Sequence, residues 1–475
     1  MGTTSPDLFI DLDRSRPRGL RAQVEGGLRS AIRSGRLAPG TRLPSSRALA
    51  TDLDVTRGVV VDAYAQLAAE GYLSSVQGSG TVVNDIRAIH DVPATDATPA
   101  RATTPPPAAV PLAVDFRSGL PDLGLFPRAA WARATRSALV SMPDAELGYV
   151  SPAGLPRLRA SVADYLGRVR GVACGPDQVM ICNGFGHGFG VVLRALADRG
   201  VTGVAVEVPG YDEPRDQMRR AGVTVHPVPV DEAGLCVDQL ADTRVGAVMV
   251  TPAHQAPTGV VMSPARRGEL ADWARSTGAY VIEDDYDAEY RYDRHPVGAL
   301  QGVVPDQVIY HGTLSKSLAP GLRLGWLVAP PDLIDELVPA RKAVDHATAS
   351  VIQATFAEFL ERGDLDRHLR RTRRIYRERR DALVESLGER LPDWRVGGVS
   401  AGLQAFVTLP DRHDSAAVSA AARRHGVGLY PVTDDLLDES RRARSLTLGY
   451  GTLRPPQIRE GIRRLADALD GQGAD

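Results

Sequence analysis

A proline-rich stretch divides this chain and limits how the rest can fold. Residues 92–111 read VPATDATPARATTPPPAAVP, with proline, threonine and alanine crowded together and no hydrophobic period. Such a segment cannot bury enough apolar surface to fold, and its prolines favour extended, semi-rigid geometry. The whole chain has 475 residues, a net charge of −2 and 43% hydrophobic residues, which fits a globular protein of about three structural units. We therefore predict a linker over residues 86–112, between a domain of residues 1–85 and a larger one of residues 113–475.

The N-terminal segment has the element order of a winged helix-turn-helix. Apolar residues recur at helical spacing over residues 18–35. A second helix is expected to begin at Ser45 or Ser46, and a third at Thr56, because these side chains can cap a helix. Two short strands then flank a glycine-rich tip at residues 77–80. Three helices followed by a β-hairpin is the order of that fold.

The second helix of a helix-turn-helix motif enters the major groove of DNA with its first residues. Side chains at that helix start meet phosphates and base edges, and a glycine-rich wing tip can approach the duplex closely. The expected DNA contacts are Ser45, Arg47, Thr56, Arg57, Gly58 and Gly78. The alternative is a winged helix that serves only as a protein–protein module.

After the linker, apolar segments alternate with amphipathic ones. Strands are expected over residues 178–182, 203–208, 224–228, 245–251, 280–284 and 308–312. Helical patterns between them predict an α/β domain with a parallel sheet that helices cover on both faces. From about residue 350 the chain becomes helical and arginine-rich, so a smaller α+β part is expected. We predict a large subdomain at about 150–345 and a small one at 346–475.

Lysine is rare in this chain. Only two of its 56 basic residues are lysines, and one of them, Lys316, lies in the stretch HGTLSKS. A desolvated lysine amine can lose its proton and form a Schiff base with an aldehyde, whereas an arginine guanidinium cannot. Lys316 is therefore a candidate for covalent chemistry, and the alternative is an ordinary surface lysine.

Several predicted strand ends offer partners for an aldehyde cofactor. Pyridoxal phosphate (PLP) needs an amine, an acid against its pyridine nitrogen, a π surface over its ring and donors for its phosphate. Asp284 and Tyr286 end one strand and Tyr211 follows another, while residues 183–188 and Arg323 offer phosphate donors. Singly, these features have the alternatives of a helix cap, a core aromatic or a turn. Together, on successive strand ends of one sheet, they indicate a single site.

These motifs carry two family resemblances. Residues 43–83 resemble the DNA-binding domain of the GntR family, and residues 113–475 resemble a fold-type I aminotransferase. The second resemblance is strongest at residues 149–156, 209–211, 251–259, 283–287 and 313–316. The whole chain is similar to the MocR subfamily of transcriptional regulators.

The resemblance implies a role for each site residue. Lys316 would form the Schiff base, Asp284 would pair with the pyridine nitrogen, Tyr286 would lie near the phenolic oxygen and Tyr211 would stack on the ring. The implied phosphate contacts are Phe185, Gly186, Thr313, Ser315 and Arg323. Tyr149 would arrive from the neighbouring subunit, so the resemblance implies a homodimer with shared PLP sites.

Three positions depart from the family pattern. His254-Gln255-Ala256 stands where related enzymes have an asparagine before Pro-Thr-Gly, and Gly186 stands where many have a glutamine. Thr447 aligns with the arginine that clamps a substrate carboxylate. Such a clamp contributes affinity and orientation to transamination, so we expect a sensor rather than an enzyme.

The resemblance thus implies a PLP-dependent regulator that binds operator DNA and senses PLP or an amino compound that reacts with it. The alternatives are an active aminotransferase with an accessory DNA-binding domain, and a scaffold built on an inert fold. A cytoplasmic location is expected, because no stretch approaches the roughly 18 apolar residues that span a bilayer. No metal site is expected, because the three cysteines are widely spaced and form no CxxC pair.

Overall fold

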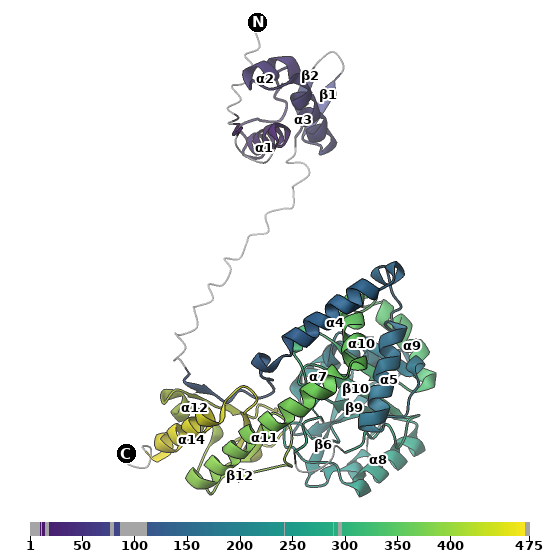
Figure 1. The fold of residues 1–475 in the computed structure, drawn as a ribbon, viewed down its shortest axis with the longest axis vertical. Coiled ribbons are helices and arrows are strands. Elements are labelled where there is room, and N and C mark those ends of the chain that lie inside the picture. Colours follow the sequence, from purple (N-terminus) through teal and green to yellow (C-terminus); the bar gives the residue numbers. More distant parts are fainter. Residues whose placement is uncertain are drawn as a thin grey trace. The chain divides into compact units, whose positions relative to one another are not determined.

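The computed structural model describes residues 10, 12–14, 19–76, 80–85, 112–241, 243–287, 289–292 and 297–470. The chain divides into two compact units, Met1–Ala108 and Ala109–Asp475, which Figure 1 draws as ribbons. The predicted linker, residues 86–112, lies outside the described part of the chain except for its last residue, Leu112. Among the described helices, none combines the length and the apolar character that a membrane crossing requires.

The first unit has three helices followed by a two-stranded antiparallel sheet, as predicted. Its elements are α1 (Leu20–Arg33), α2 (Ser46–Asp52), α3 (Arg57–Ala69), β1 (Leu73–Val76) and β2 (Gly80–Val83). Ser45 caps α2, because its hydroxyl accepts a hydrogen bond from the Ala48 N–H at 3.2 Å. Leu28, Val60 and Leu67 are fully buried in the shared core, which holds α1 against α3.

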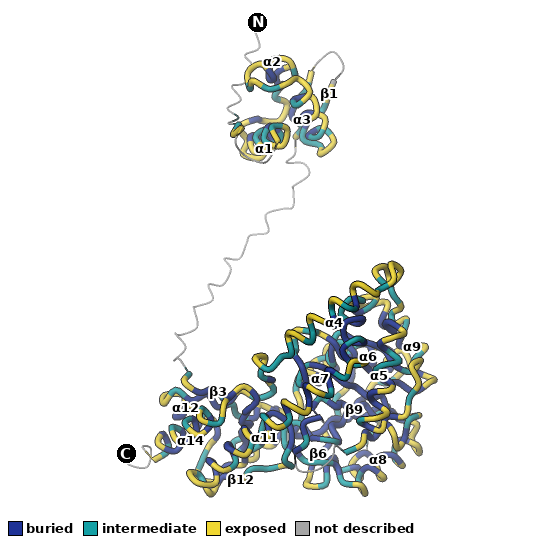
Figure 2. Tube along the Cα trace, viewed as in Figure 1, coloured by how far each residue is buried: buried dark blue, intermediate teal, exposed yellow. Residues whose placement is uncertain are grey.

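The second unit is built on an eight-stranded mixed sheet with the order β4-β11-β10-β9-β8-β5-β6-β7. Its strands are β4 (Val179–Cys182), β5 (Gly203–Val208), β6 (Thr224–Asp231), β7 (Gly234–Leu235), β8 (Ala247–Val250), β9 (Tyr280–Asp285), β10 (Val308–Thr313) and β11 (Gly325–Val328). The inner strands are buried along their whole length, as Figure 2 shows for β9. Burial of consecutive residues means that both faces of the sheet are covered.

The expected parallel sheet also contains antiparallel strands, the edge strand β7 beside β6 and the inner strand β11. Strand β11 runs antiparallel to both of its neighbours, β10 and β4. Only residues 314–324 connect β10 to β11, and a parallel crossover needs a dozen or more residues. The chain therefore turns back directly, and the turn contains Lys316.

Helices cover both faces of the sheet, as predicted. One face carries α4 (Arg128–Ser141), α5 (Pro156–Arg170), α8 (Pro264–Thr277) and α10 (Ser350–Glu361). The other face carries α6 (Phe185–Asp198), α7 (Asp212–Arg220) and α9 (Pro331–Lys342). Successive residues of β10 follow this division, because Tyr310 packs with α5 and α10 while Ile309 packs with α6 and α9.

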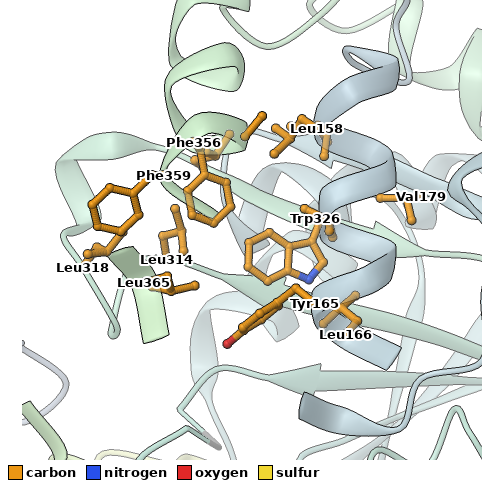
Figure 3. Packing of buried hydrophobic residues seen from close by; sticks show 14 of the residues in the cluster. Leu158, Tyr165, Leu166, Val179, Leu314, Leu318, Trp326, Phe356, Phe359 and Leu365 are labelled. Atoms are coloured by element: carbon orange, nitrogen blue, oxygen red, sulfur yellow. The ribbon is translucent and has the colours of Figure 1, made fainter. Parts of the chain in front are cut away.

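Trp326 of β11 packs at the centre of the first face (Figure 3). Its ring stacks on Phe356 of α10 with centroids 5.9 Å apart, and meets Tyr165 of α5 edge to face at 6.4 Å. A Cβ atom at Gly312 of β10 would lie 2.4 Å from Trp326 Nε1, so no larger residue fits there. This packing fixes the strand that follows the Lys316 turn.

A smaller α+β part completes the second unit. Its sheet has the order β12-β13-β16-β15, with β12 (Arg395–Val396), β13 (Gln404–Thr408), β15 (Tyr430–Pro431) and β16 (Ser445–Gly449). The helices α11 (Asp364–Arg390), α12 (Ser415–Arg424) and α14 (Pro455–Asp470) pack on it, and α13 (Glu439–Arg442) precedes β16. Strand β3 (Val114–Asp115) pairs with β14 (Val427–Gly428), so the start of the unit joins this part rather than the large sheet. The remaining short elements are the 3-10 turns η2 (Leu123–Leu125), η3 (Asp144–Leu147), η4 (Pro176–Gln178), η5 (Val237–Leu240) and η6 (Pro320–Leu322).

A buried ion pair holds α5 to β9. Arg170 donates from Nε to Asp285 Oδ2 at 2.7 Å and from Nη2 to Oδ1 at 3.1 Å, and both side chains are almost fully buried. The Tyr310 hydroxyl donates to the same carboxylate at 2.6 Å. The Asp285 carboxylate is therefore paired with a cation and hydrogen-bonded inside the protein.

Removing the arginine is expected to destabilise the second unit strongly. Arg170→Ala would leave an uncompensated buried carboxylate and should lower the free energy of unfolding by about 3–5 kcal/mol. Arg168→Ala is the matched control, because Arg168 forms a largely exposed pair with Asp366, whose loss should cost at most about 1 kcal/mol. Urea denaturation followed by circular dichroism measures both variants. Equal losses in the two would contradict the interpretation.

Candidate functional site

The turn after β10 brings Lys316 to the carboxyl edge of the large sheet. Lys316 Nζ donates a hydrogen bond to the Gly119 carbonyl at 2.6 Å. Burial lowers the pKa of the Lys316 amine, and the nearby carboxylates of Asp287, Asp284 and Glu213 offset part of that decrease. The structure therefore holds an amine that gives up its proton more readily than a surface lysine does.

Strand β9 ends in a run of acids, and Asp284 is the one with an unpartnered oxygen. Glu283 accepts hydrogen bonds from two backbone N–H groups, Asp285 is held by the ion pair with α5, and Asp287 is held by His254. Asp284 Oδ1 is buried and has no hydrogen-bond partner among the described residues. A buried polar atom without a partner costs free energy, so this oxygen is suited to a donor supplied by a ligand.

Burial raises the pKa of the Asp284 carboxyl well above its ordinary value. The neighbouring Asp285 adds to this increase, and the positive charge of Lys316 opposes it. The register of the sheet pairs Asp284 with His311 of β10, whose Nε2 also lacks a hydrogen-bond partner among the described residues. Burial lowers the pKa of His311 to about 3, so its ring is neutral.

Tyr286 lies in a buried polar cluster with His254 and Asp287, and the sequence did not predict this arrangement. Its hydroxyl lies 3.2 Å from His254 Nδ1, which in turn lies 3.0 Å from both carboxylate oxygens of Asp287. Gln255 instead donates to the Pro209 carbonyl at 2.7 Å. Where related enzymes have an asparagine, His254 is thus the residue beside Tyr286. The sequence signal for this contact was the motif His254-Gln255-Ala256 before Pro-Thr-Gly. The motif alone did not show which of its three residues would lie beside Tyr286.

The turn from β4 into α6 faces Arg323. Gly184 has a φ of +85°, and a Cβ atom there would lie 3.5–3.6 Å from the Arg323 guanidinium. Phe185 and Gly186 follow as the first residues of α6, where backbone N–H groups have no partner within the helix. A guanidinium beside a helix N-terminus is an arrangement that binds phosphate.

Thr313 and Ser315 lie beside this turn. Their hydroxyls are 2.9 Å apart, and Thr313 pairs with Gly325 of β11. A Cβ atom at Gly325 would lie 3.2 Å from Gly184 Cα, so the end of β10 is adjacent to the start of α6. The structure thus brings together the residues for which the resemblance implies phosphate contacts.

Tyr211 follows β5 and is about half exposed, at 48%. Its hydroxyl donates to Glu213, and burial together with that carboxylate raises the pKa of the phenol. The negative charge of Asp284 also raises the pKa of Tyr211, so the two side chains are close enough to interact electrostatically. The preceding Gly210 N–H donates to Asp434 Oδ2 at 2.8 Å, which ties this turn to the smaller α+β part.

Tyr149 is 94% exposed within the described protomer. Its ring meets His346 edge to face with centroids 5.4 Å apart. The contact with a second subunit that the resemblance implies for Tyr149 stays a prediction.

The first unit presents the predicted DNA contacts at the start of α3. Thr56, Arg57 and Gly58 are exposed, as is Arg47 on α2. Arg57 Nε donates to Ser46 Oγ at 3.3 Å, which holds the guanidinium near the start of both helices. The sequence predicts Ser46 only as a candidate helix cap, because a contact that joins two helices leaves no local sequence signal. Gly78 lies outside the described residues, so its predicted contact has no structural description.

The residues of the second unit fit PLP. A largely buried amine, a buried carboxylate with an unpartnered oxygen, an aromatic ring and a helix-start turn beside a guanidinium lie along one edge of the sheet. These are the groups that this cofactor requires.

The cofactor-free protein is expected to be more stable without the Asp284 charge. Because its pKa in the folded state is raised, this group lowers stability as pH rises above about 4, the ordinary Asp pKa, where the unfolded chain has already lost the proton. Asp284→Asn should therefore stabilise the cofactor-free protein by about 1–3 kcal/mol at pH 7, with no gain near pH 4. Asp285→Asn, which weakens the ion pair with Arg170, should destabilise it. Thermal unfolding at both pH values measures the two variants, and the same sign for both would refute this assignment.

Two family models match the chain. Residues 113–454 match aminotransferase class I and II, and residues 20–83 match bacterial regulatory proteins, gntR family. The probable rhizopine catabolism regulatory protein MocR of Rhizobium meliloti is 34% identical, over 98% of this chain and 97% of that protein. The HTH-type pyridoxine biosynthesis transcriptional regulator PdxR of Corynebacterium glutamicum is 35% identical, over 88% of this chain and 89% of that protein.

A solved aminotransferase structure is also similar to the second unit. The kynurenine aminotransferase of Pyrococcus horikoshii, determined in complex with PMP, has a TM-score of 0.68 and 27% identity, over 76% of this chain and 91% of that one. The predicted fold class and PLP as the cofactor of this fold are thereby confirmed. Because a gntR-type helix-turn-helix precedes the aminotransferase-like domain, and relatives of nearly full length share both, the chain belongs to the MocR-type GntR regulators.

Proposed function

We propose that this protein regulates transcription by binding operator DNA with its first unit and sensing PLP, or an amino compound that reacts with PLP, with its second. The observation that carries the proposal is the buried Lys316 amine close to the unpartnered Asp284 oxygen, in a chain that also exposes Arg57 at the start of α3. Such a regulator acts in the cytoplasm, where its DNA lies.

Different residues of the second unit would bind different parts of the cofactor. PLP, when bound, supplies an aldehyde that condenses with primary amines. Lys316 offers such an amine, and Asp284 offers its unpartnered oxygen to the pyridine N–H. Tyr286 and His254 provide polar atoms for the phenolic oxygen, and Tyr211 provides the ring that stacks.

The phosphate end is held by a separate set of groups. The backbone N–H groups of Phe185 and Gly186, the hydroxyls of Thr313 and Ser315 and the guanidinium of Arg323 would bind it. We further propose a homodimer in which Tyr149 of each protomer completes the site of the other. Its exposure supports this role.

An aminotransferase with an accessory DNA-binding domain is the second candidate. It is less well supported, because the aminotransferase relative aligns with 75% of this chain, whereas the regulator MocR aligns with 98% of it.

Regulation requires that the cofactor site and the DNA site are coupled. The ligand must bind one arrangement of the protein more tightly than another. With DNA selected from a random pool by the wild-type protein, adding PLP should change affinity by about fivefold or more. Lys316→Ala should reduce this change below about twofold, because the covalent contact is lost. Fluorescence anisotropy with and without PLP measures both proteins, and identical affinity in all four states would defeat the proposal.

DNA binding should depend on Arg57. Arg57→Ala removes a guanidinium at the helix start and should weaken affinity for the selected DNA by about 10- to 100-fold. Arg33→Ala is the control. Arg33 donates a hydrogen bond to the Tyr72 hydroxyl, and Tyr72 follows the far end of α3, about 20 Å along the helix from Arg57. The visible absorbance of bound PLP should be unchanged in both variants. Equal affinity of the two variants for DNA would contradict the assignment of α3.

A further inference from the structure

Arg117 lies in a segment that reaches the Lys316 amine. This segment follows β3 and runs along the end of β16, where the Gly449 N–H donates to the Phe116 carbonyl at 2.8 Å. A Cβ atom at Gly449 would lie 2.0 Å from the Arg117 carbonyl oxygen, so the approach requires glycine. Two residues after Arg117, the Gly119 carbonyl accepts the hydrogen bond from Lys316. Arg117 and Gly119 are two residues apart, so their Cα atoms lie within about 7 Å of each other.

The strand beside this segment carries Thr447 on the face that points toward the large sheet. Thr447 is paired directly with Phe406 on β13 and with Tyr430 on β15, and paired residues share a face. Phe406 packs against a small buried cluster that includes Val208, at the end of β5. Since Tyr211 follows that strand end, Thr447 and Tyr430 face the cofactor side of the small part.

The guanidinium of Arg117 rests on Tyr430. Its Nη2 and Nε donate to the Tyr430 hydroxyl at 3.1 and 3.3 Å, and its central carbon lies 5.4 Å from the ring centroid. Asp115 Oδ2 forms an ion pair with Arg117 Nε at 3.6 Å, which is too long for a hydrogen bond, and the Arg117 side chain is 60% exposed. The hydroxyl of Tyr430 accepts from Arg117 and donates to no other described residue. The pair thus offers guanidinium N–H groups and one O–H for an anion.

We propose that Arg117 and Tyr430 bind the carboxylate of an amino acid whose amine faces Lys316. They would supply, from the start of the unit, the clamp that Thr447 does not supply from β16. A guanidinium fork matches a carboxylate, and the tyrosine hydroxyl adds a neutral donor beside it. This inference rests on the proposed sensing of amino compounds and specifies their class as amino acids with a free carboxylate.

Equilibrium titrations of full-length, PLP-loaded protein test the proposal. The ligands are L-alanine, L-glutamate, β-alanine and 4-aminobutyrate, each with the matched primary amide that lacks the carboxylate. The shift of the visible PLP absorbance gives each dissociation constant without DNA. At least one acid should bind the wild type about 10- to 100-fold more tightly than its amide, and the responding acid distinguishes α- from ω-amino acids.

The variants identify the residues responsible. Arg117→Gln should remove the preference for the acid over its amide, Arg117→Lys should restore it in part, and Tyr430→Phe should weaken it. Arg412→Gln, which removes an exposed arginine paired with Asp393, should leave the preference unchanged. PLP absorbance without added ligand should be the same in all of them, which separates this site from the cofactor site.

Two results would overturn the inference. One is an Arg117→Gln protein that keeps the full preference, since Arg117 would then be a surface arginine only. The other is a wild type whose PLP absorbance responds equally to acids and amides, or responds to neither. In that last case sensing of PLP itself, which the DNA-binding measurements with PLP test separately, is unaffected.

Discussion

Burying several carboxylates at the end of one strand costs free energy unless each finds a partner, and this constraint organises the second unit. The acids at the end of β9 draw their partners from different parts of the chain. Asp285 is paired with Arg170 of α5, Asp287 with His254 after β8, and Glu283 with backbone N–H groups near residue 300. Each pair fixes one neighbouring element against β9. Asp284 is left with an oxygen that a ligand can satisfy, so the same packing that stabilises the fold also selects the site residue.

The antiparallel strand β11 has a comparable effect on Lys316. Because the connection from β10 is short, the chain cannot place a helix there and turns back at the carboxyl edge of the sheet. Trp326 anchors the returning strand in the core between α5 and α10. The lysine is thereby held in a partly buried turn, and burial makes its amine easier to deprotonate. A sensor that depends on amine chemistry needs this property as much as an enzyme does.

Much of the fold could be predicted from local sequence. The β5 and β10 segments were predicted within one residue of their bounds, because runs of apolar residues between helical patterns are typical of buried strands. The antiparallel β11 was missed, since a short apolar strand carries no sign of its direction. Among the site residues, Lys316 and Asp284 stood out by composition and resemblance, and their cofactor roles stay predictions. The contacts of His254 with Tyr286 and of Arg117 with Tyr430 could not be predicted, because these partners lie 32 and 313 positions away.

The sequence by itself determined the order of the domains, the helix-turn-helix with an arginine at the start of its second helix, and the rarity of lysine that made Lys316 a candidate. These depend on spacing and residue type within short segments, where helical and strand periods act directly. The tertiary structure decided which acid keeps an unpartnered oxygen, that His254 rather than Gln255 lies beside Tyr286, and that Arg117 rests on Tyr430 near Thr447. Each of these depends on which side chains packing brings together, because the free energy of a buried charge is set by its neighbours in space rather than in sequence.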